Sequence, residues 1–449
     1  MDKRPIRLKA YLDDSTYGNL SNLDNQDPAI QYWASFANGP DFLAFNHTFV
    51  QTDLKSAGFI PSYWQDQDIV DPGIYFVSLR NTSNWWTGHT SPIPNCLTFV
   101  HQNILQAMRE RTVILVLCNQ TEGEAMLGGA FHQMHDTMEF MNLPPYSIII
   151  STGHTDSRQL YHNWCANNNI EPMLTIHHTY LDNTFPKEVI DSMPDLLVDN
   201  AIANKNSKDF MSLNYTVKQH RLEHLYFLLQ NDLDKKGLIS GHWHRNEPES
   251  NILKTFISRW SGDIDDLELS KVLNKKLPLI ADKLTFDGSN PADTHDYNFN
   301  TDLYSNALLS FVTESEFNQQ GSFITEKTYK ALLSGHPVIT LNGSGAVQSM
   351  RDFGFRTDWT MINNWYDDIQ DHTHRFKAAH QELLRWCNLT REEQLEHLYK
   401  SRDVLKHNKD RVVELSRNDE STNFYSNYAI ETYNRLRQVV EDVYMRYYT

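Results

Sequence analysis

The chain has 449 residues, of which 40% are hydrophobic and 22% are charged, as in a water-soluble globular protein. This length exceeds what one hydrophobic core usually serves, so it predicts two or three domains. Acidic residues number 57 and basic residues 40, and the resulting net charge of -17 repels nucleic-acid backbones and anionic membranes at long range.

The first residues and the cysteines bear on the compartment. No stretch approaches the roughly 20 apolar residues that cross a bilayer, and the opening MDKRPIRLKAYLDD lacks the apolar core of a signal peptide. Four cysteines lie far apart with no C-x-x-C pair, namely Cys96, Cys118, Cys165 and Cys387. We therefore predict a cytoplasmic protein with buried free thiols and no membrane partner.

Strand and helix patterns alternate in the first half of the chain. Residues 1–105 are rich in aromatics and turn formers without a helical period, so we expect a β-containing N-terminal portion. From Thr112 the strand patterns TVILVLC, YSIIIST and EPMLTIHH alternate with the helical patterns AFHQMHDTMEFM and DSRQLYHNWCANNN. This alternation predicts a Rossmann-like domain with a parallel sheet over residues 106–205.

A second alternating block covers residues 206–388. It contains the strand pattern DFMSLN, the helical pattern KQHRLEHLYFLLQN and, after a polar excursion, the strand pattern NALLSFVT. Residues 389–449 are charged and helical, and we expect these C-terminal helices to pack and to cross back onto the first domain. The predicted fold class is therefore α/β, with two Rossmann-like domains facing across a cleft at the carboxyl ends of their sheets.

The stretch ITEKTYKALLSGHPVITLNG, residues 324–343, predicts a loop, a helix, a tight turn and a buried strand. Thr325 is the expected N-cap, and Gly335 is expected to end the helix. A helix N-terminus attracts anions, and Lys327 adds a full positive charge in the first turn, which suits a diphosphate. Glu326 suits the hydroxyl groups of a sugar, because carboxylates accept hydrogen bonds from vicinal hydroxyls. The alternative is an ordinary solvated helix end.

Two further patterns precede this helix. Asn214 ends a predicted strand, and Arg221 lies on the next predicted helix, where a guanidinium group can hold two phosphate oxygens. Phe311 and Glu314 stand where another predicted strand runs into a loop.

In this order, the three patterns resemble the donor domain of the α-1,3-fucosyltransferase-type glycosyltransferases of GT-B fold, including the fucosyltransferase-like proteins of large bacterial viruses. The resemblance is good over residues 208–355 and faint over 110–205. It implies a metal-independent, inverting enzyme that takes a nucleoside-diphosphate sugar, with a GDP-sugar favoured, and a glycan or another hydroxyl-bearing acceptor. For a viral protein, the compartment would be the host cytoplasm.

The same resemblance implies roles for single residues. Arg221 and Lys327 would bind the diphosphate, Glu326 the ribose or sugar hydroxyls, and Tyr329 and Asn214 would line the pocket. Glu314 matches the acidic residue of the family's F-x-x-E motif. The family usually has an acidic or amide partner directly after that motif, whereas this sequence reads FVTESE.

The acceptor hydroxyl needs a general base, which we expect at a strand end of the first domain. Glu122 follows the predicted strand TVILVLC and is the first candidate; Glu124 lies two residues on. His154, after the next predicted strand, is the reserve base or an orienting residue. The alternative for both glutamates is that they are ordinary acidic residues at the start of a helix.

Other kinds of site and function find less support. The histidine pairs lack clustered metal-ligating partners, and Asp263 and Asp265 form a D-x-D that follows no buried strand, so we predict no metal site. Two alternatives to a glycan-directed transferase remain. One is a non-catalytic protein that kept a nucleotide-sugar fold, and the other is a transferase acting on hydroxymethylated bases of viral DNA, which the net charge of -17 disfavours.

Overall fold

The computed structural model contains two compact units, residues 1–182 with 428–449 (unit 1) and residues 183–427 (unit 2), and each is described by itself. The residues that the structure describes are 7–12, 55, 57–63, 69–78, 100, 102–119, 128–178, 184–193, 195–214, 218–241, 271–273, 299–317, 321–418, 424–427 and 429–448.

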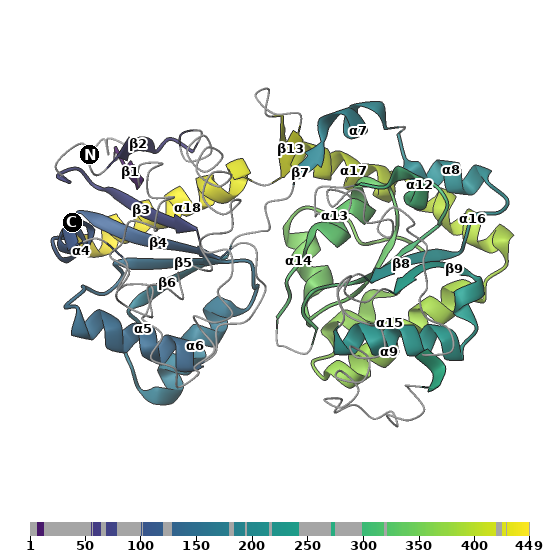
Figure 1. Ribbon diagram of the computed structural model, residues 1–449, viewed down its shortest axis with the longest axis horizontal. Helices are drawn as coiled ribbons and strands as arrows, with labels where there is room; N and C mark the ends of the chain where they lie inside the picture. The colour runs from purple at the N-terminus through teal and green to yellow at the C-terminus, as the bar shows by residue number, and fades with distance from the viewer. Residues whose placement is uncertain are drawn as a thin grey trace. The chain divides into compact units, whose positions relative to one another are not determined.

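Unit 1 is built on a parallel sheet of six strands in the order β2-β1-β3-β4-β5-β6 (Figure 1). The strands are β1 (Lys9–Leu12), β2 (Ile60–Tyr63), β3 (Gly73–Ser78), β4 (Val113–Asn119), β5 (Ile148–Thr152) and β6 (Leu174–His178). Helices α4 (Gln102–Arg109), α5 (Gly128–Phe140) and α6 (Ser157–Asn168) alternate with the later strands. This parallel sheet with alternating helices is the arrangement that the sequence pattern predicts.

The two faces of this sheet bury different helices. Leu115 and Leu117 belong to one apolar cluster with residues of α4, α5 and α6. Ile114 and Val116, one position out of step, belong to a second cluster with residues of α18 (Ala429–Val443). Successive strand side chains point to opposite faces, so the continuous apolar run of β4 serves both layers.

The unit boundaries differ from the predicted domains in three respects. Strands β1, β2 and β3, which are the described strands among the first 105 residues, join the same sheet as β4. Residues 183–205 belong to unit 2. The C-terminal helices are divided, because α16 (Arg391–Lys400) and α17 (Arg402–Leu415) lie in unit 2 whereas α18 packs its apolar side against the sheet of unit 1. Sequence periodicity reports that a helix buries one side, but not which sheet that side meets.

Unit 2 is built on a parallel sheet of four strands in the order β11-β10-β8-β9. The strands are β8 (Phe210–Asn214), β9 (Gly237–Gly241), β10 (Ser310–Thr313) and β11 (Val338–Leu341). The chain adds β9 on one side of β8 and then returns to place β10 on the other side. The strand order therefore reverses between β8 and β10, and open α/β sheets bind their ligands beyond the carboxyl ends of the strands at such a switch point.

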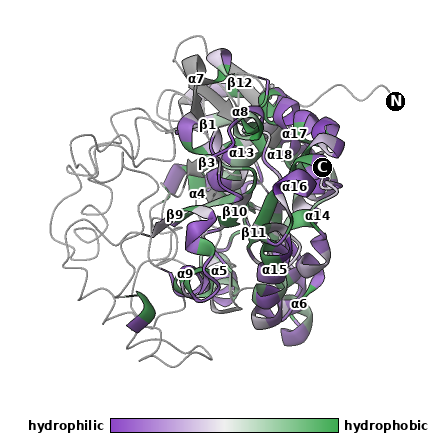
Figure 2. Ribbon diagram, turned by 90° about the vertical axis from the view of Figure 1, so that its right-hand side faces the viewer, coloured by the Kyte–Doolittle hydropathy of each residue, from purple (hydrophilic) through white to green (hydrophobic). Residues whose placement is uncertain are grey.

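Helices cover both faces of the unit 2 sheet. Figure 1 shows α9 (Gln219–Gln230) and α15 (His372–Cys387) on one side, with α13 (Glu326–Leu333) and α17 on the other. Strands β10 and β11 carry hydrophobic residues, while the surrounding helices are largely hydrophilic in colour (Figure 2). The remaining elements are α7 (Lys187–Ser192), α8 (Leu197–Ala203), η5 (Leu233–Lys235), α12 (Thr301–Tyr304), α14 (Ala346–Asp352), η8 (Asn364–Asp368), η9 (Tyr444–Tyr448) and an antiparallel sheet of β7 (Thr184–Pro186), β12 (Ser416–Asn418) and β13 (Phe424–Asn427).

Two of the whole-chain predictions concern membranes and thiols. Among the described residues, no helix combines the length and the apolar character needed to cross a membrane. Cys165 and Cys387 are buried free thiols, as predicted. Burial raises the pKa of both thiols, to about 12 for Cys387. Cys96 lies outside the described residues.

Candidate functional site

The predicted site residues of unit 2 meet at the carboxyl edge of its sheet, at the switch point. Asn214 is the last residue of β8, and Thr313 is the last residue of the neighbouring strand β10. The Thr313 hydroxyl donates to Asn214 Oδ1 at 2.6 Å, which joins the two strand ends. Glu314 directly follows Thr313. The structure therefore brings Asn214 and Glu314 to the same edge of the sheet, although they are far apart in the sequence.

Glu314 anchors the helix that follows. Its carboxylate has no exposed surface. It accepts hydrogen bonds from the Thr325 amide at 3.0 Å, from the Thr328 hydroxyl at 2.6 Å and from the Thr325 hydroxyl. Burial raises the pKa of Glu314, an effect that the positive charge of Lys327 opposes. The side chain thus fixes the start of α13 to the end of β10.

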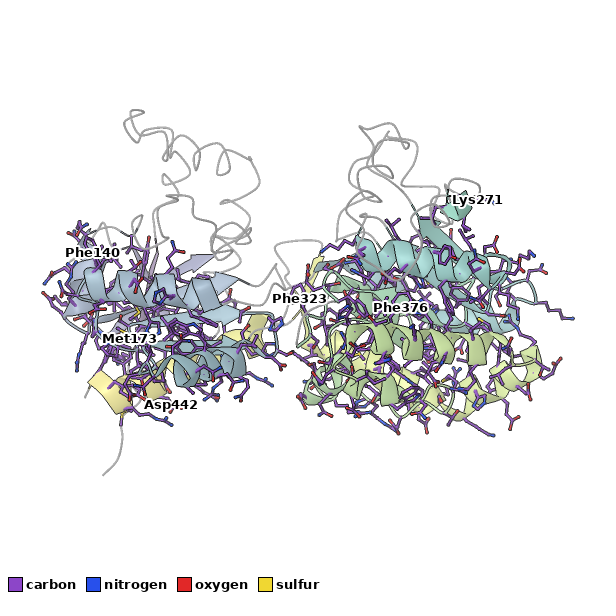
Figure 3. The ribbon with its side chains drawn as sticks, turned by 90° about the horizontal axis from the view of Figure 1, so that it is seen from below. Phe140, Met173, Lys271, Phe323, Phe376 and Asp442 are labelled. Carbon is purple, nitrogen blue, oxygen red and sulfur yellow. The ribbon has the colours of Figure 1, made fainter. Side chains whose placement is uncertain are left out.

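The N-terminus of α13 has the local structure that the sequence predicts. Thr325 is the N-cap, and its hydroxyl oxygen accepts a hydrogen bond from the Lys327 amide at 3.4 Å. Gly335 follows the helix with a φ of 73°, the left-handed conformation that glycine adopts at helix ends. Asn342, just after β11, holds the loop before α13. It accepts a hydrogen bond from the Phe323 amide at 3.3 Å and donates one to the Phe323 carbonyl at 2.9 Å. Figure 3 labels Phe323 in this loop.

Glu326 and Lys327 form an ion pair in the first turn of α13. The Lys327 ammonium lies 2.5 Å from Glu326 Oε1 and 3.1 Å from the Thr325 hydroxyl. The side chain of Lys327 is 28% exposed and that of Glu326 is 10% exposed, so a ligand can reach the cation. Burial favours the neutral carboxyl group, but the charges of Lys327 and Lys330 outweigh it and hold the pKa of Glu326 at about 2. Glu326 is therefore an acceptor-only carboxylate at neutral pH.

Arg221 lies at the same edge but is deeply buried, with 3% of its surface exposed. Its Nη2 donates to the carbonyl oxygens of Thr313 and Glu314, each at 3.2 Å. Burial lowers the pKa of the guanidinium group, while the nearby carboxylates of Glu314 and Glu326 oppose the change. The geometry gives Arg221 a role in holding the end of β10, and its predicted contact with a diphosphate stays a prediction.

Tyr329 differs from the other predicted residues in its surroundings. Its side chain has no exposed surface, and its ring lies 6.3 Å from that of Phe355. This position gives the ring a packing role on α13. Its contribution to a ligand pocket stays a prediction.

Several residues at this edge were missed by sequence reasoning. The Lys218 ammonium donates to the Ser315 carbonyl at 2.5 Å and pairs with Glu316 at 2.8 Å. His220 Nε2 donates to the Glu314 carbonyl at 2.9 Å. Asn342 was visible in the sequence as a polar residue directly after the strand pattern VITL. The two others carry no local sequence mark that separates them from ordinary helix residues.

In unit 1 the predicted base candidates are only partly described. Glu122 and Glu124 lie outside the described residues, in the segment after β4. His154 follows β5, is fully buried, and lies with Nδ1 3.2 Å from the Ser157 hydroxyl at the start of α6. Next to it, His178 at the end of β6 donates from Nε2 to the Gly153 carbonyl at 3.2 Å. A fully buried imidazole suits an orienting role better than direct proton transfer to a bound acceptor.

The remaining metal candidates fall mostly on residues that are not described. Asp263 and Asp265, with the histidine pair His242 and His244, lie in the segment 242–270. Within the described ranges, no three histidine, cysteine, aspartate or glutamate side chains gather as metal ligands would.

Four buried histidines of unit 2 predict a pH-dependent stability. Burial lowers the pKa of His220 and His380 to about 3, that of His336 to about 4, and that of His224 well below its ordinary 6.5. Below pH 6.5 the unfolded chain binds protons that the folded unit does not. Stability is therefore full above that pH and falls by about 1.4 kcal/mol per pH unit for each histidine.

We expect the free energy of unfolding by urea to be constant above about pH 7 and to decrease from about pH 6.5 to 5, a range above most carboxyl titrations. His336→Phe should reduce the slope of the unfolding free energy against pH by up to about 1.4 kcal/mol per pH unit, the contribution of one histidine. A slope that is flat over this range would contradict the buried neutral histidines.

Comparison with known proteins adds little to this geometry. No protein-family model matches the chain, and no curated protein matches it. A solved structure described as "Trehalose-6-phosphate from E. coli bound with UDP-2-fluoro glucose" is similar over 87% of this chain and 95% of that chain, with 10% sequence identity and a TM-score of 0.38. A likeness of this degree carries no argument about activity or ligand.

Proposed function

We propose that the protein is a glycosyltransferase that moves a sugar from a nucleoside-diphosphate sugar to an acceptor hydroxyl. The observation that carries the proposal is the N-terminus of α13, which presents a partly exposed Lys327 and an ionised Glu326 at the switch point of the unit 2 sheet. Buried Glu314 fixes this helix end to the strand edge. An anion site beside a hydroxyl-binding carboxylate matches a ligand with both a diphosphate and sugar hydroxyls.

In this proposal the donor lies at the carboxyl edge of unit 2. The helix N-terminus and Lys327 neutralise the diphosphate as its bond to the sugar breaks, and Arg221 adds buried positive charge behind the strand ends. Glu326 accepts from the ribose or sugar hydroxyls. These groups supply the charge stabilisation that a divalent metal supplies elsewhere, so we propose metal-independent transfer. A GDP-sugar is the donor that the family resemblance favours.

The proposed reaction is a single displacement with inversion at the anomeric carbon. The acceptor oxygen attacks that carbon while the bond to the β-phosphate oxygen breaks, and the leaving nucleoside diphosphate takes the electron pair. The acceptor proton passes to a carboxylate, for which Glu122 of unit 1 is the candidate. The acceptor is a glycan or another hydroxyl-bearing molecule.

Calorimetry with GDP and UDP, each with and without EDTA, tests this function. We expect one nucleotide to bind and chelation to leave its affinity unchanged. Loss of binding in EDTA would overturn the metal-independent mechanism. Absence of binding by both nucleotides and by their sugar conjugates would favour a non-catalytic protein of the same fold.

Lys327→Ala should weaken pyrophosphate and nucleoside-diphosphate binding alike. A hydrogen bond to a charged group contributes about 1.5 to 3 kcal/mol, which corresponds to a ten- to hundredfold loss of affinity. Glu326→Gln should weaken nucleoside-diphosphate binding but hardly change pyrophosphate binding, because its proposed partners are hydroxyls. Lys400→Ala, on the exposed side of α16 where the ammonium pairs with Glu396, is the control and should retain near-normal affinity. Titration calorimetry on the four proteins checks this, and equal affinities throughout would make these residues ordinary surface charges.

A further inference from the structure

A chain of buried hydrogen bonds runs from α15 to the switch point of unit 2. His380 Nδ1 lies 2.7 Å from the Phe376 carbonyl, and His380 Nε2 lies 2.8 Å from Nδ1 of His224 on α9. His224 Nε2 lies 2.9 Å from the Ser212 hydroxyl of β8. Ser212 then accepts from Asn214 Nδ2 at 3.3 Å. The chain ends at the Asn214 amide, which the proposed donor site contains.

The rings of this chain are enclosed by aromatic side chains. His224 stacks on Phe311 of β10 with centroids 4.5 Å apart and an interplanar angle of 5°. The ring of His380 lies 4.0 Å from Phe376 and 4.3 Å from Phe227. Figure 3 labels Phe376. Neither histidine has exposed surface, and burial holds the pKa of each far below neutral, so both imidazoles are uncharged.

Because both imidazole rings are neutral, the hydrogen bonds between His380 and Asn214 can have only one order of donors and acceptors. A carbonyl only accepts, so His380 carries its proton on Nδ1 and its Nε2 is an acceptor. His224 must then donate from Nδ1, which makes its Nε2 an acceptor for the Ser212 hydroxyl proton. Ser212 has given its only proton to this bond and can only accept from Asn214. Asn214 therefore turns Nδ2 toward Ser212 and Oδ1 toward Thr313, whose hydroxyl donates to it at 2.6 Å.

The opposite orientation of the Asn214 amide is disfavoured. It would place Oδ1 against the lone pairs of Ser212, whose proton is already engaged by His224. An amide flip is otherwise almost free, because the oxygen and the nitrogen occupy the same shape. One Nδ2 proton of Asn214 is used by Ser212, and the described structure assigns no partner to the second.

We propose that His380 and His224 are positioning residues that fix the amide of Asn214 so that it presents an N–H donor to a phosphate oxygen of the donor ligand. The phosphate ligand in this inference rests on the proposed function, whereas the series of hydrogen bonds from His380 to Asn214 does not. A flipped amide would face the anion with a carbonyl oxygen and repel it. The two histidines thus select for an anionic group at this position without touching it.

A matched control exists in the same unit. His336 is also a buried, neutral histidine, with Nδ1 2.9 Å from the Ser310 hydroxyl and Nε2 2.8 Å from the Tyr304 carbonyl. Ser310 is the first residue of β10, at the amino edge of the sheet, whereas Asn214 and Thr313 lie at the carboxyl edge. His336→Phe therefore removes a comparable buried histidine without altering the chain to Asn214.

The experiment has two arms. In the first, nitrogen-15 spectra of the histidine-labelled full-length protein should show His380 and His224 neutral and protonated on Nδ1. An Nε2–H tautomer for either ring would overturn the inference. This arm needs no ligand, so it gives a result even if the proposed function fails.

In the second arm, calorimetry measures the affinity for inorganic pyrophosphate and for GDP. His380→Phe should weaken both by roughly ten- to a hundredfold, because a charged-group hydrogen bond is replaced by a repulsive contact. Ser212→Ala removes one hydroxyl from the middle of the chain and provides a second variant if the first folds poorly. The affinity of the His336→Phe control should equal that of the wild type. Wild-type affinity in both chain variants, or equal losses in the control, would overturn the positioning role.

Discussion

Glu122→Gln is expected to reduce the turnover number for sugar transfer by about 100- to 10,000-fold, the usual contribution of a positioned general base. The glutamine keeps the size of the side chain but cannot take the acceptor proton. Glu122 follows β4, which lies inside the six-stranded sheet between β3 and β5. Loops after the carboxyl ends of such strands carry the functional groups of α/β folds. Donor affinity should change little, because the proposed donor site belongs to unit 2.

Glu124→Gln is the matched control for this prediction. The two glutamates are separated by Gly123 alone, so Glu124→Gln removes the same kind of charge two positions further along the chain. We expect Glu124→Gln to retain most of its turnover. Steady-state kinetics and donor titrations on both variants decide between them. Full activity in Glu122→Gln would move the base to Glu124 or, through a change in its surroundings, to His154.

The convergence of the unit 2 residues could be predicted from sequence because it follows from a rule of parallel sheets. Asn214 ends one recognisable buried strand and Glu314 follows another, and the carboxyl ends of parallel strands share one edge. The cap at Thr325 and the helix end at Gly335 are local patterns, and both were confirmed. Each of these predictions required only a short window of sequence.

What could not be predicted depends on partners far along the chain. His224 and His380 meet at 2.8 Å although they are 156 residues apart, and neither has a local pattern that distinguishes it from a core histidine. The sharing of one sheet by β1 and β4 likewise depends on strand order, which periodicity does not encode. The sequence predicted Arg221 on a helix at the carboxyl edge of the sheet, but not its hydrogen bonds to the carbonyl oxygens of Thr313 and Glu314, which lie more than 90 residues away.

Glu314→Ala should lower the free energy of unfolding by about 3 to 5 kcal/mol, because it deletes one partner of a buried charged network. Three hydrogen-bond donors, the Thr325 amide and the hydroxyls of Thr325 and Thr328, would lose their acceptor. The neighbouring guanidinium group of Arg221 would lose a nearby negative charge. A loss of this size is a large part of the roughly 5 to 15 kcal/mol that stabilises a typical protein.

The isosteric variant separates the hydrogen bonds from the charge. Glu314→Gln keeps an acceptor oxygen for the Thr325 amide and the Thr328 hydroxyl, and its amide group can donate to the Thr325 hydroxyl, so its loss of stability should be clearly smaller than that of the alanine variant. Because Glu314 fixes the N-terminus of α13, the alanine variant should also bind pyrophosphate more weakly, even at temperatures where it remains folded. Urea unfolding and pyrophosphate calorimetry on both variants measure the two effects. Equal stability of Glu314→Ala and the wild type would show that the start of α13 is held by its own N-cap and by Asn342, without the carboxylate.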